Sequence, residues 1–168
     1  MKKLCKIFVS FLIVIGFFCL NGNAEDLKKG TTSGIFPFSG TFTYLAMGKE
    51  RAHMSYEMYG SMIPDPGNTI FKNSSVHCLG ALHAINGHFD DDKGACVYTD
   101  PDGDQFFTTY QDKGDMGQGG KGNYEYVGGT GKYAGLKGSG EYTMVELKPA
   151  KEGTFQSIST YKGNWELP

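Results

Sequence analysis

The sequence predicts an all-β protein folded as an eight-stranded antiparallel β-barrel, and three observations support this. Short stretches in which apolar and polar residues alternate recur along the chain, which is the pattern of half-buried strands. Glycine and proline separate these stretches, with 25 glycines and 6 prolines in 168 residues. No stretch has the 3.6-residue apolar period of an amphipathic helix. Closure into a barrel removes exposed sheet edges, and eight strands leave room for a packed core or one small ligand.

The N-terminal residues have the pattern of a signal peptide. Lys2, Lys3 and Lys6 precede an apolar run over residues 7–20, and small residues ending at Ala24 match a peptidase site. The run of about 14 residues is shorter than the roughly 20 that a membrane span needs. We predict cleavage after Ala24, a secreted or periplasmic location in a bacterium, and no stable membrane insertion of the mature chain. An uncleaved N-terminal anchor is the alternative.

Cleavage of the signal peptide, residues 1–24, leaves an acidic mature chain. It retains 13 basic and 18 acidic residues, a net charge of −5. A chain of this charge without a basic patch is not expected to bind nucleic acid. Residues 25–33 are polar and aperiodic, which predicts a flexible N-terminal lead. Residues 34–168 are then predicted to form a single barrel domain.

Each predicted strand is an alternating stretch between glycine, proline or polar residues. In the first stretch Phe42 and Tyr44 alternate with Thr41 and Thr43. The predicted strands are 40–46, 54–59, 76–85, 95–99, 106–110, 123–127, 140–147 and 155–165.

Turn-forming and polar residues predict the connections between these strands. Two prolines and a Pro-Gly pair place a loop at 63–68, and the Asp-Pro-Asp-Gly-Asp sequence at 100–104 predicts a turn. Residues 86–94 are interpreted as a polar connection, and residues 111–122 as a mobile, glycine-rich loop. A further loop is predicted at 148–153.

Two cysteines remain in the mature chain, Cys78 and Cys96. Cysteines of exported proteins most often pair, and these two fall in neighbouring predicted strands. We therefore predict a cross-strand disulfide that stabilises the fold by about 3 kcal/mol in the chain-entropy model. A reactive thiol or a metal ligand is the alternative.

The glycine-rich stretch 128–142 predicts a tight corner between two strands, because glycine destabilises helices and permits left-handed turns. Within it, the sequence Gly-Gly-Thr-Gly-Lys-Tyr-Ala-Gly over 128–135, followed by Gly-Ser-Gly at 138–140, resembles a segment of allene oxide cyclase-like and dirigent-like barrels. The spacing of Cys96, Asp100 and Asp104 ahead of an aromatic strand is similar to that of bacterial members of this group.

The resemblance covers roughly residues 75–145 and implies an eight-stranded antiparallel barrel, related in shape to lipocalins and often hollow. Known relatives include isomerising and pericyclic cyclases, proteins that orient radical coupling, and exported proteins without an assigned role. None of the family's catalytic residues matches a position of this sequence. The relatives often form dimers or trimers, so the resemblance also leaves a homo-oligomer open.

Aromatic residues make up 14% of the chain, and most of those in the strands share one face. Such residues either fill a barrel core or line a cavity with their hydroxyls directed at a ligand. The residues predicted to bind a ligand are Tyr44, Tyr56, Phe106, Tyr110, Tyr126, Tyr142 and Trp165; Tyr161 shares their pattern.

The acidic groups Asp90–Asp92 and Asp100–Asp104 leave a calcium site open. They do not form an EF-hand, because Gly103 is the fourth residue of the loop and Gln111 stands where the bidentate glutamate belongs. These groups flank the strand predicted at 95–99 and need not converge, so a solvated turn is the other interpretation. No metal site is predicted.

Other chemical motifs are absent or incomplete. Tyr133 follows Lys132 where a phosphate-binding loop needs serine or threonine, so no nucleotide is predicted. The histidines His77 and His83 are too far apart along one strand to bind one zinc ion. No nucleophile elbow precedes a helix. Glu57 is either an inward general acid or base or, as the favoured interpretation, a carboxylate that faces water.

Three hypotheses about function follow. The first is an exported barrel that binds a small hydrophobic or aromatic molecule, without a cofactor and without catalysis of its own. The second is a cyclase- or isomerase-like enzyme that uses the same cavity, with a tyrosine or Glu57 assisting. The third is a structural or interaction protein with a filled barrel. A cavity that contains a buried ionisable group would favour the enzyme, and one lined by apolar groups and hydroxyls alone would favour the binder.

Overall fold

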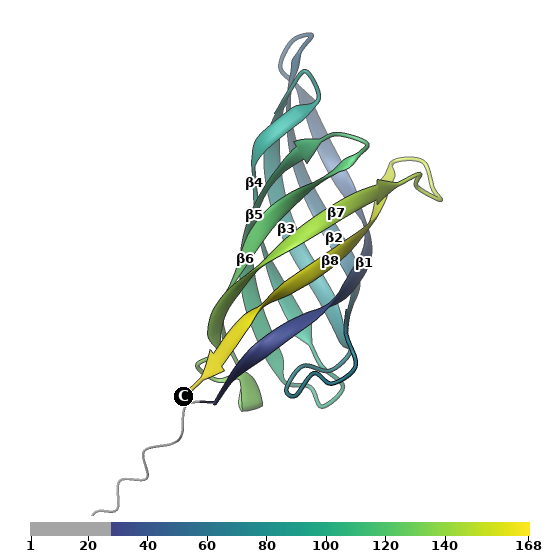
Figure 1. Cartoon of the computed structure of the whole chain (residues 1–168). Coiled ribbons are helices and arrows are strands. Elements are labelled where there is room, and N and C mark those ends of the chain that lie inside the picture. The colour runs from purple at the N-terminus through teal and green to yellow at the C-terminus, as the bar shows by residue number, and fades with distance from the viewer. Residues whose placement is uncertain (1–27) are drawn as a thin grey trace, which may run out of the picture.

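The computed structural model describes residues 28–168, which form a closed barrel of eight antiparallel strands (Figure 1). The strands are β1 (Lys28–Ala46), β2 (Arg51–Pro64), β3 (Ser74–Ile85), β4 (His88–Thr99), β5 (Gln105–Asp115), β6 (Gly119–Gly129), β7 (Lys137–Leu147) and β8 (Thr154–Leu167). Each strand pairs with the next in sequence, and β8 closes the barrel against β1. The predicted fold class is confirmed. The predicted signal peptide lies outside the described residues.

The strands are longer than the alternating stretches that predict them. β1 begins at Lys28, which pairs with Leu167, and residues 28–33 are hydrogen-bonded along β8. This part of the chain is therefore a barrel strand, whereas the sequence predicts a flexible lead. A polar, aperiodic stretch can still form a strand where a neighbouring strand satisfies its backbone groups.

Two segments predicted as loops are also largely strand. β4 starts at His88, so the connection from β3 consists only of Asn86 and Gly87. Both have positive φ, 51° and 80°, as a two-residue type I′ hairpin turn requires. The segment 111–122 likewise continues β5 to Asp115 and starts β6 at Gly119. Aspartate and glycine occupy inward positions in both segments, Asp92 and Gly94 in one and Asp112 and Gly122 in the other, so the apolar alternation that marks a strand is interrupted.

One end of the barrel is closed by a packed aromatic core, at the bottom of Figure 1 beside the C-terminus. Phe71, from the loop between β2 and β3, packs against Phe106, Tyr126, Tyr133 and Trp165 with ring centroids 5.0–6.3 Å away. Tyr133 and Phe106 are fully buried. This end therefore forms the floor of the barrel interior.

The glycine-rich corner is the connection from β6 to β7, and it holds this floor in place. It contains the 3-10 turn η1 (Gly131–Tyr133). The hydroxyl of Tyr133 donates to Asp100 Oδ2 at 3.1 Å, and Lys132 forms ion pairs with Asp100 and Asp102. The corner thus fastens the β6–β7 connection to the β4–β5 turn. Gly131 has φ 51°, and a Cβ there would lie 1.8 Å from a carboxylate oxygen of that turn.

Cys78 and Cys96 form a disulfide between β3 and β4, as predicted. They lie directly opposite each other in the register and face the barrel interior, where they are 1% and 4% exposed. A disulfide is consistent with an extracellular or periplasmic location. No helix in residues 28–168 is long and apolar enough to cross a membrane.

Candidate functional site: a buried acid pair in the barrel cavity

The barrel interior above the aromatic floor is a cavity of about 430 Å³. Its mouth is marked by Phe42, Tyr44 and Met116, which line the cavity and yet remain 39%, 57% and 38% exposed. These residues lie near the hairpin turns at the upper end of Figure 1. Aromatic rings and methionines supply most of the wall. The cavity is therefore suited to a small hydrophobic or aromatic molecule.

Most of the aromatic residues predicted to bind a ligand line this cavity. These are Tyr44, Tyr56, Phe106, Tyr110, Tyr126 and Tyr142, and Tyr161 lines it as well. Trp165 does not. It belongs to the floor, where its indole N–H donates to the backbone oxygen of Thr31 at 3.3 Å. Ligand binding by the other residues stays a prediction.

Asp92 of β4 and Asp112 of β5 lie side by side on the inner wall, and we call them the acid pair. They are direct partners in the antiparallel register, and their side chains line the cavity. Only 4% of Asp92 and 5% of Asp112 is exposed. Directly opposite residues have Cβ atoms about 5 Å apart, so the two carboxyl groups are immediate neighbours.

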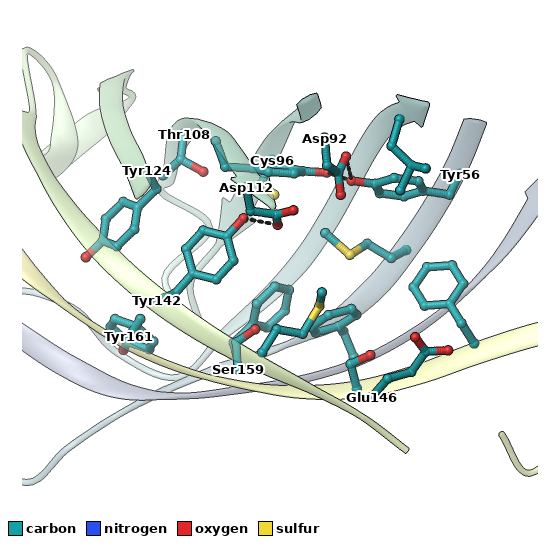
Figure 2. Close-up of a pocket in the computed structure, with 18 of the residues that line it drawn as sticks. Tyr56, Asp92, Cys96, Thr108, Asp112, Tyr124, Tyr142, Glu146, Ser159 and Tyr161 are labelled. Atoms are coloured by element: carbon teal, nitrogen blue, oxygen red, sulfur yellow. Dashed lines mark hydrogen bonds between the residues drawn. The ribbon is translucent and has the colours of Figure 1, made fainter. Parts of the chain in front are cut away.

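Two tyrosine hydroxyls donate to the acid pair (Figure 2), and the hydroxyl of a third tyrosine contacts one of them. Tyr56 donates to Asp92 Oδ1 at 2.6 Å, and its oxygen lies 2.7 Å from the hydroxyl of Tyr110. Tyr142 donates to Asp112 Oδ2. The other oxygen of Asp112, Oδ1, is buried and has no hydrogen-bond partner among residues 28–168. When the acid pair holds a proton, the two carboxyl groups also hydrogen-bond to each other, and this oxygen lacks a donor only once both are ionised.

A β-bulge lets Phe89 face inward together with Asp92, which keeps the alternation of Cys96 and Tyr98. The register between β4 and β5 shifts between Phe89 and Asp92, and both of these residues face the interior although they are three positions apart. An extra residue in one strand re-aims the side chains that follow it. Asp91, the preceding residue, instead faces outward, where it accepts from the backbone N–H of His83 at 3.0 Å.

Glycines in the wall make room for the acid pair and its tyrosines. A Cβ at Gly94 would lie 2.2 Å from the Tyr110 hydroxyl oxygen, and one at Gly80 would lie 2.4 Å from it. Gly122 occupies the position opposite Asp112 in β6, and a Cβ there would be 2.4 Å from that residue's own Cβ. Real Cβ atoms do not approach so closely, so side chains at these positions would displace the polar groups.

Burial keeps the acid pair protonated at pH values where aspartate is normally ionised. It raises the pKa of Asp92 to about 8, and the neighbouring charge of Asp112 adds to the effect. Burial also raises the pKa of Asp112, although the hydrogen bond from Tyr142 opposes this. Two adjacent carboxylates in an apolar cavity cannot both ionise easily. The acid pair therefore holds at least one proton at neutral pH.

Burial also raises the pKa of the tyrosines around the acid pair, Tyr56, Tyr110 and Tyr142. They are neutral hydrogen-bond donors over the whole physiological range. Two more hydroxyls, of Tyr124 and Tyr161, line the cavity without a hydrogen-bond partner in the described part of the chain. Figure 2 shows them on the side away from Tyr56. Their oxygens lie against the wall, since a Cβ at Gly140 would be 2.4 Å from the Tyr124 oxygen and one at Gly34 would be 2.7 Å from the Tyr161 oxygen.

Comparison by sequence gives no family, since no protein-family model and no curated protein matches the chain. Comparison by structure finds a similar barrel. The structure of a pterocarpan synthase dirigent protein is 12% identical to this chain with a TM-score of 0.47, and the match covers 94% of this chain and 98% of that one. A likeness at this identity concerns the fold alone.

The other residues considered from the sequence lie outside the cavity. Glu57 faces outward, as the favoured interpretation has it, and accepts hydrogen bonds from Tyr59 at 2.6 Å and from His77 at 2.8 Å. Its assistance in catalysis inside the barrel is therefore excluded. His83 pairs on the outside with Asp91. Within residues 28–168 no group of three or more His, Cys, Asp or Glu side chains is placed to hold a metal ion.

The two acidic groups considered for calcium do not converge. Asp92 lies in the cavity, whereas Asp100 and Asp102 pair with Lys132 at the closed end. Asp100 Oδ1 also accepts the backbone N–H of Asp102 at 2.8 Å, as in an Asx turn. The 100–104 carboxylates thus fasten the turn to its neighbours.

Sequence reasoning missed the acid pair because both aspartates fall in segments interpreted as loops. One available signal was the Asn86-Gly87 dipeptide, which favours a type I′ hairpin and would have extended β4 to Asp92. Another available signal was the alternation along β5, because Asp112 continues the series of inward-facing residues Phe106, Thr108 and Tyr110.

Proposed function

We propose that this barrel binds one small hydrophobic or aromatic molecule in its cavity and that the acid pair acts on that molecule as general acid and base. The observation that carries the proposal is the placement of two buried carboxyl groups, Asp92 and Asp112, on the wall of a cavity lined mostly by aromatic rings and methionines. An empty interior of about 430 Å³ also disfavours the alternative of a filled barrel.

The chemistry that suits the acid pair is a proton transfer that leaves the molecule's composition unchanged. A carboxyl group that holds a proton can donate it to one atom of the molecule, while a neighbouring carboxylate removes a proton from another. Such a step isomerises or cyclises the molecule and needs no cofactor. The hydroxyls of Tyr56 and Tyr142 fix the two carboxyl groups in place, which is what a positioned acid and base require.

Binding without catalysis is the second candidate function. It is favoured by the large share of aromatic and methionine side chains in the wall. Methionine side chains adapt to ligands of different shape. In this case the acid pair would serve only to orient the molecule.

We also propose that the chain is an exported, distant relative of the allene oxide cyclase-like and dirigent-like barrels. The glycine-rich corner that resembles their sequence forms the connection between β6 and β7. The buried disulfide supports export, because such bonds persist in oxidising compartments.

Native mass spectrometry of the protein purified from its own host tests the proposal. We expect the mature protein to carry a small molecule that is absent after denaturation. Incubation of that molecule with the protein should then yield a product of the same mass, and the Asp92→Asn and Asp112→Asn variants should not form it. Asp91→Asn is the matched control, since Asp91 is adjacent in sequence but lies outside the barrel. A molecule that binds and is returned unchanged would leave binding as the function; no bound molecule would refute both.

A further inference from the structure

The cavity wall carries ionisable groups of one sign only. Its carboxyl groups are Asp92, Asp112 and Glu146, and no lysine, arginine or histidine of residues 28–168 lines it. Figure 2 shows Glu146 across the cavity from the acid pair. An anionic ligand would lose its hydration here and find no cation to replace it. The wall therefore disfavours carboxylates and phosphates, fatty acids included.

The same wall offers two features that stabilise a cation. Aromatic rings attract a cation to their faces, and this effect is larger where water is excluded. Around the acid pair the rings of Tyr110 and Tyr142 meet edge to face at 6.5 Å, and Tyr56 meets Phe155 in the same way at 5.9 Å. A second, independent feature is Oδ1 of Asp112, which has no donor among residues 28–168 when the acid pair is ionised, because a buried acceptor without a donor is costly.

We infer that the ligand of this cavity is a hydrophobic amine in its cationic form, with the ammonium group bound at the acid pair and the apolar body among the aromatic rings. The inference rests on the proposed function, in that the cavity must hold a ligand at all. An ammonium group has three donors, which can replace the proton of the acid pair and bind the ionised carboxyl groups of Asp112 and Asp92.

Binding of the amine is coupled to the proton of the acid pair. A bound cation favours the ionised carboxylate, so the protein releases a proton as the amine binds. The groups that face the acid pair from β2, β5 and β7 are Tyr56, Tyr110 and Tyr142, whose hydroxyls stay neutral because burial raises their pKa. On β6 Tyr124 is neutral for the same reason. Affinity for the amine should therefore rise with pH up to the pKa of Asp92, about 8.

Three probes of nearly equal shape test the inference: tryptamine, the neutral alcohol tryptophol, and the anion indole-3-propionate. Titration calorimetry of the mature protein should show that tryptamine binds at least about 10-fold more tightly than tryptophol, since hydrogen bonds to charged groups are the stronger ones. Indole-3-propionate should bind least well. For tryptamine the heat should change with the ionisation enthalpy of the buffer, which reports proton release.

Variants test whether the acid pair causes the preference for tryptamine over tryptophol. Asp112→Asn should reduce tryptamine affinity by about 10- to 100-fold and leave tryptophol affinity within about threefold, which also shows that the cavity is intact. The control Asp91→Asn should keep the preference. Equal or tighter binding of tryptophol by the parent protein would overturn the inference while leaving the proposed function in place. If none of the three probes binds, the inference is refuted. The proposed function is refuted as well only if protein purified from its own host carries no bound molecule.

Discussion

Replacement of Asp92 by asparagine should change how stability depends on pH. The substitution keeps the shape of the side chain and an oxygen that accepts the hydrogen bond from Tyr56, which is 2.6 Å long in the parent. It removes the group that takes up a proton on folding. The change in stability therefore reports the ionisation of Asp92 rather than a loss of packing.

The sign and size follow from the pKa. Burial raises the pKa of Asp92 from 3.8 to about 8, so between these values the folded protein keeps a proton that the unfolded chain releases. The stability of the parent is therefore fully present below about pH 4 and declines as pH rises to about 8. At about 1.4 kcal/mol per pH unit, the decline from Asp92 reaches roughly 6 kcal/mol. Asp112 contributes in the same direction, because burial raises its pKa too.

Urea unfolding, monitored by the fluorescence of Trp165 at a series of pH values, measures how the unfolding free energy depends on pH. We expect the unfolding free energy of the parent to fall between pH 5 and pH 8. The unfolding free energy of Asp92→Asn should fall less steeply with pH than that of the parent. At about pH 8 the variant should be more stable than the parent by several kcal/mol, and at about pH 4 the two stabilities should differ by about 1 kcal/mol or less. The control Asp91→Asn should keep the parent's slope. A parent whose stability rises over this range, or an unchanged slope in Asp92→Asn, would refute the reasoning.

Three further changes test the fold and the wall of the site. Replacing Cys78 and Cys96 by alanine should lower the unfolding free energy by about 3 kcal/mol because 18 positions separate the linked residues; no loss in urea unfolding would contradict this. Gly131→Ala should cost at least about 2 kcal/mol, since φ is 51° and the added carbon meets a carboxylate oxygen; a thermal midpoint equal to the parent's would show that the corner can relax. Gly94→Ala should displace the Tyr110 hydroxyl and reduce ligand affinity about 10-fold. A crystal structure of the variant with Tyr110 in its original position would contradict the expected clash between the added carbon and that hydroxyl.

The fold could be predicted from the sequence because the barrel's core strands obey a period of two and are separated by turn residues. Residues 76–85 illustrate this, since Val76, Cys78 and Leu82 face the core in regular alternation. The disulfide could be predicted because Cys78 and Cys96 fall in neighbouring predicted strands. The glycine-rich corner was recognised as scaffold, and the structure adds that it fastens the closed end through Tyr133 and Lys132.

The site could be predicted only in part. The aromatic wall was found because tyrosine and phenylalanine occupy inward positions of regular strands. The acid pair was missed because inward-facing aspartates and glycines look like loop residues, and because a β-bulge breaks the alternation between Phe89 and Asp92. Trp165 was assigned to the cavity because alternation along a strand shows that a side chain faces inward but not how far along the barrel axis it lies. The loop between β2 and β3 places Phe71 against Trp165, so Trp165 belongs to the floor.

The central claim is that Asp92 and Asp112 share a proton inside the cavity at neutral pH. Carbon-13 NMR of the side-chain carboxyl groups, titrated with pH and assigned with the two asparagine variants, measures this directly. The account predicts that the acid pair titrates in two steps and that its upper apparent pKa is about 8. If both carboxyl groups lose their protons near the ordinary aspartate value of 3.8, the acid pair is not the buried general acid proposed here.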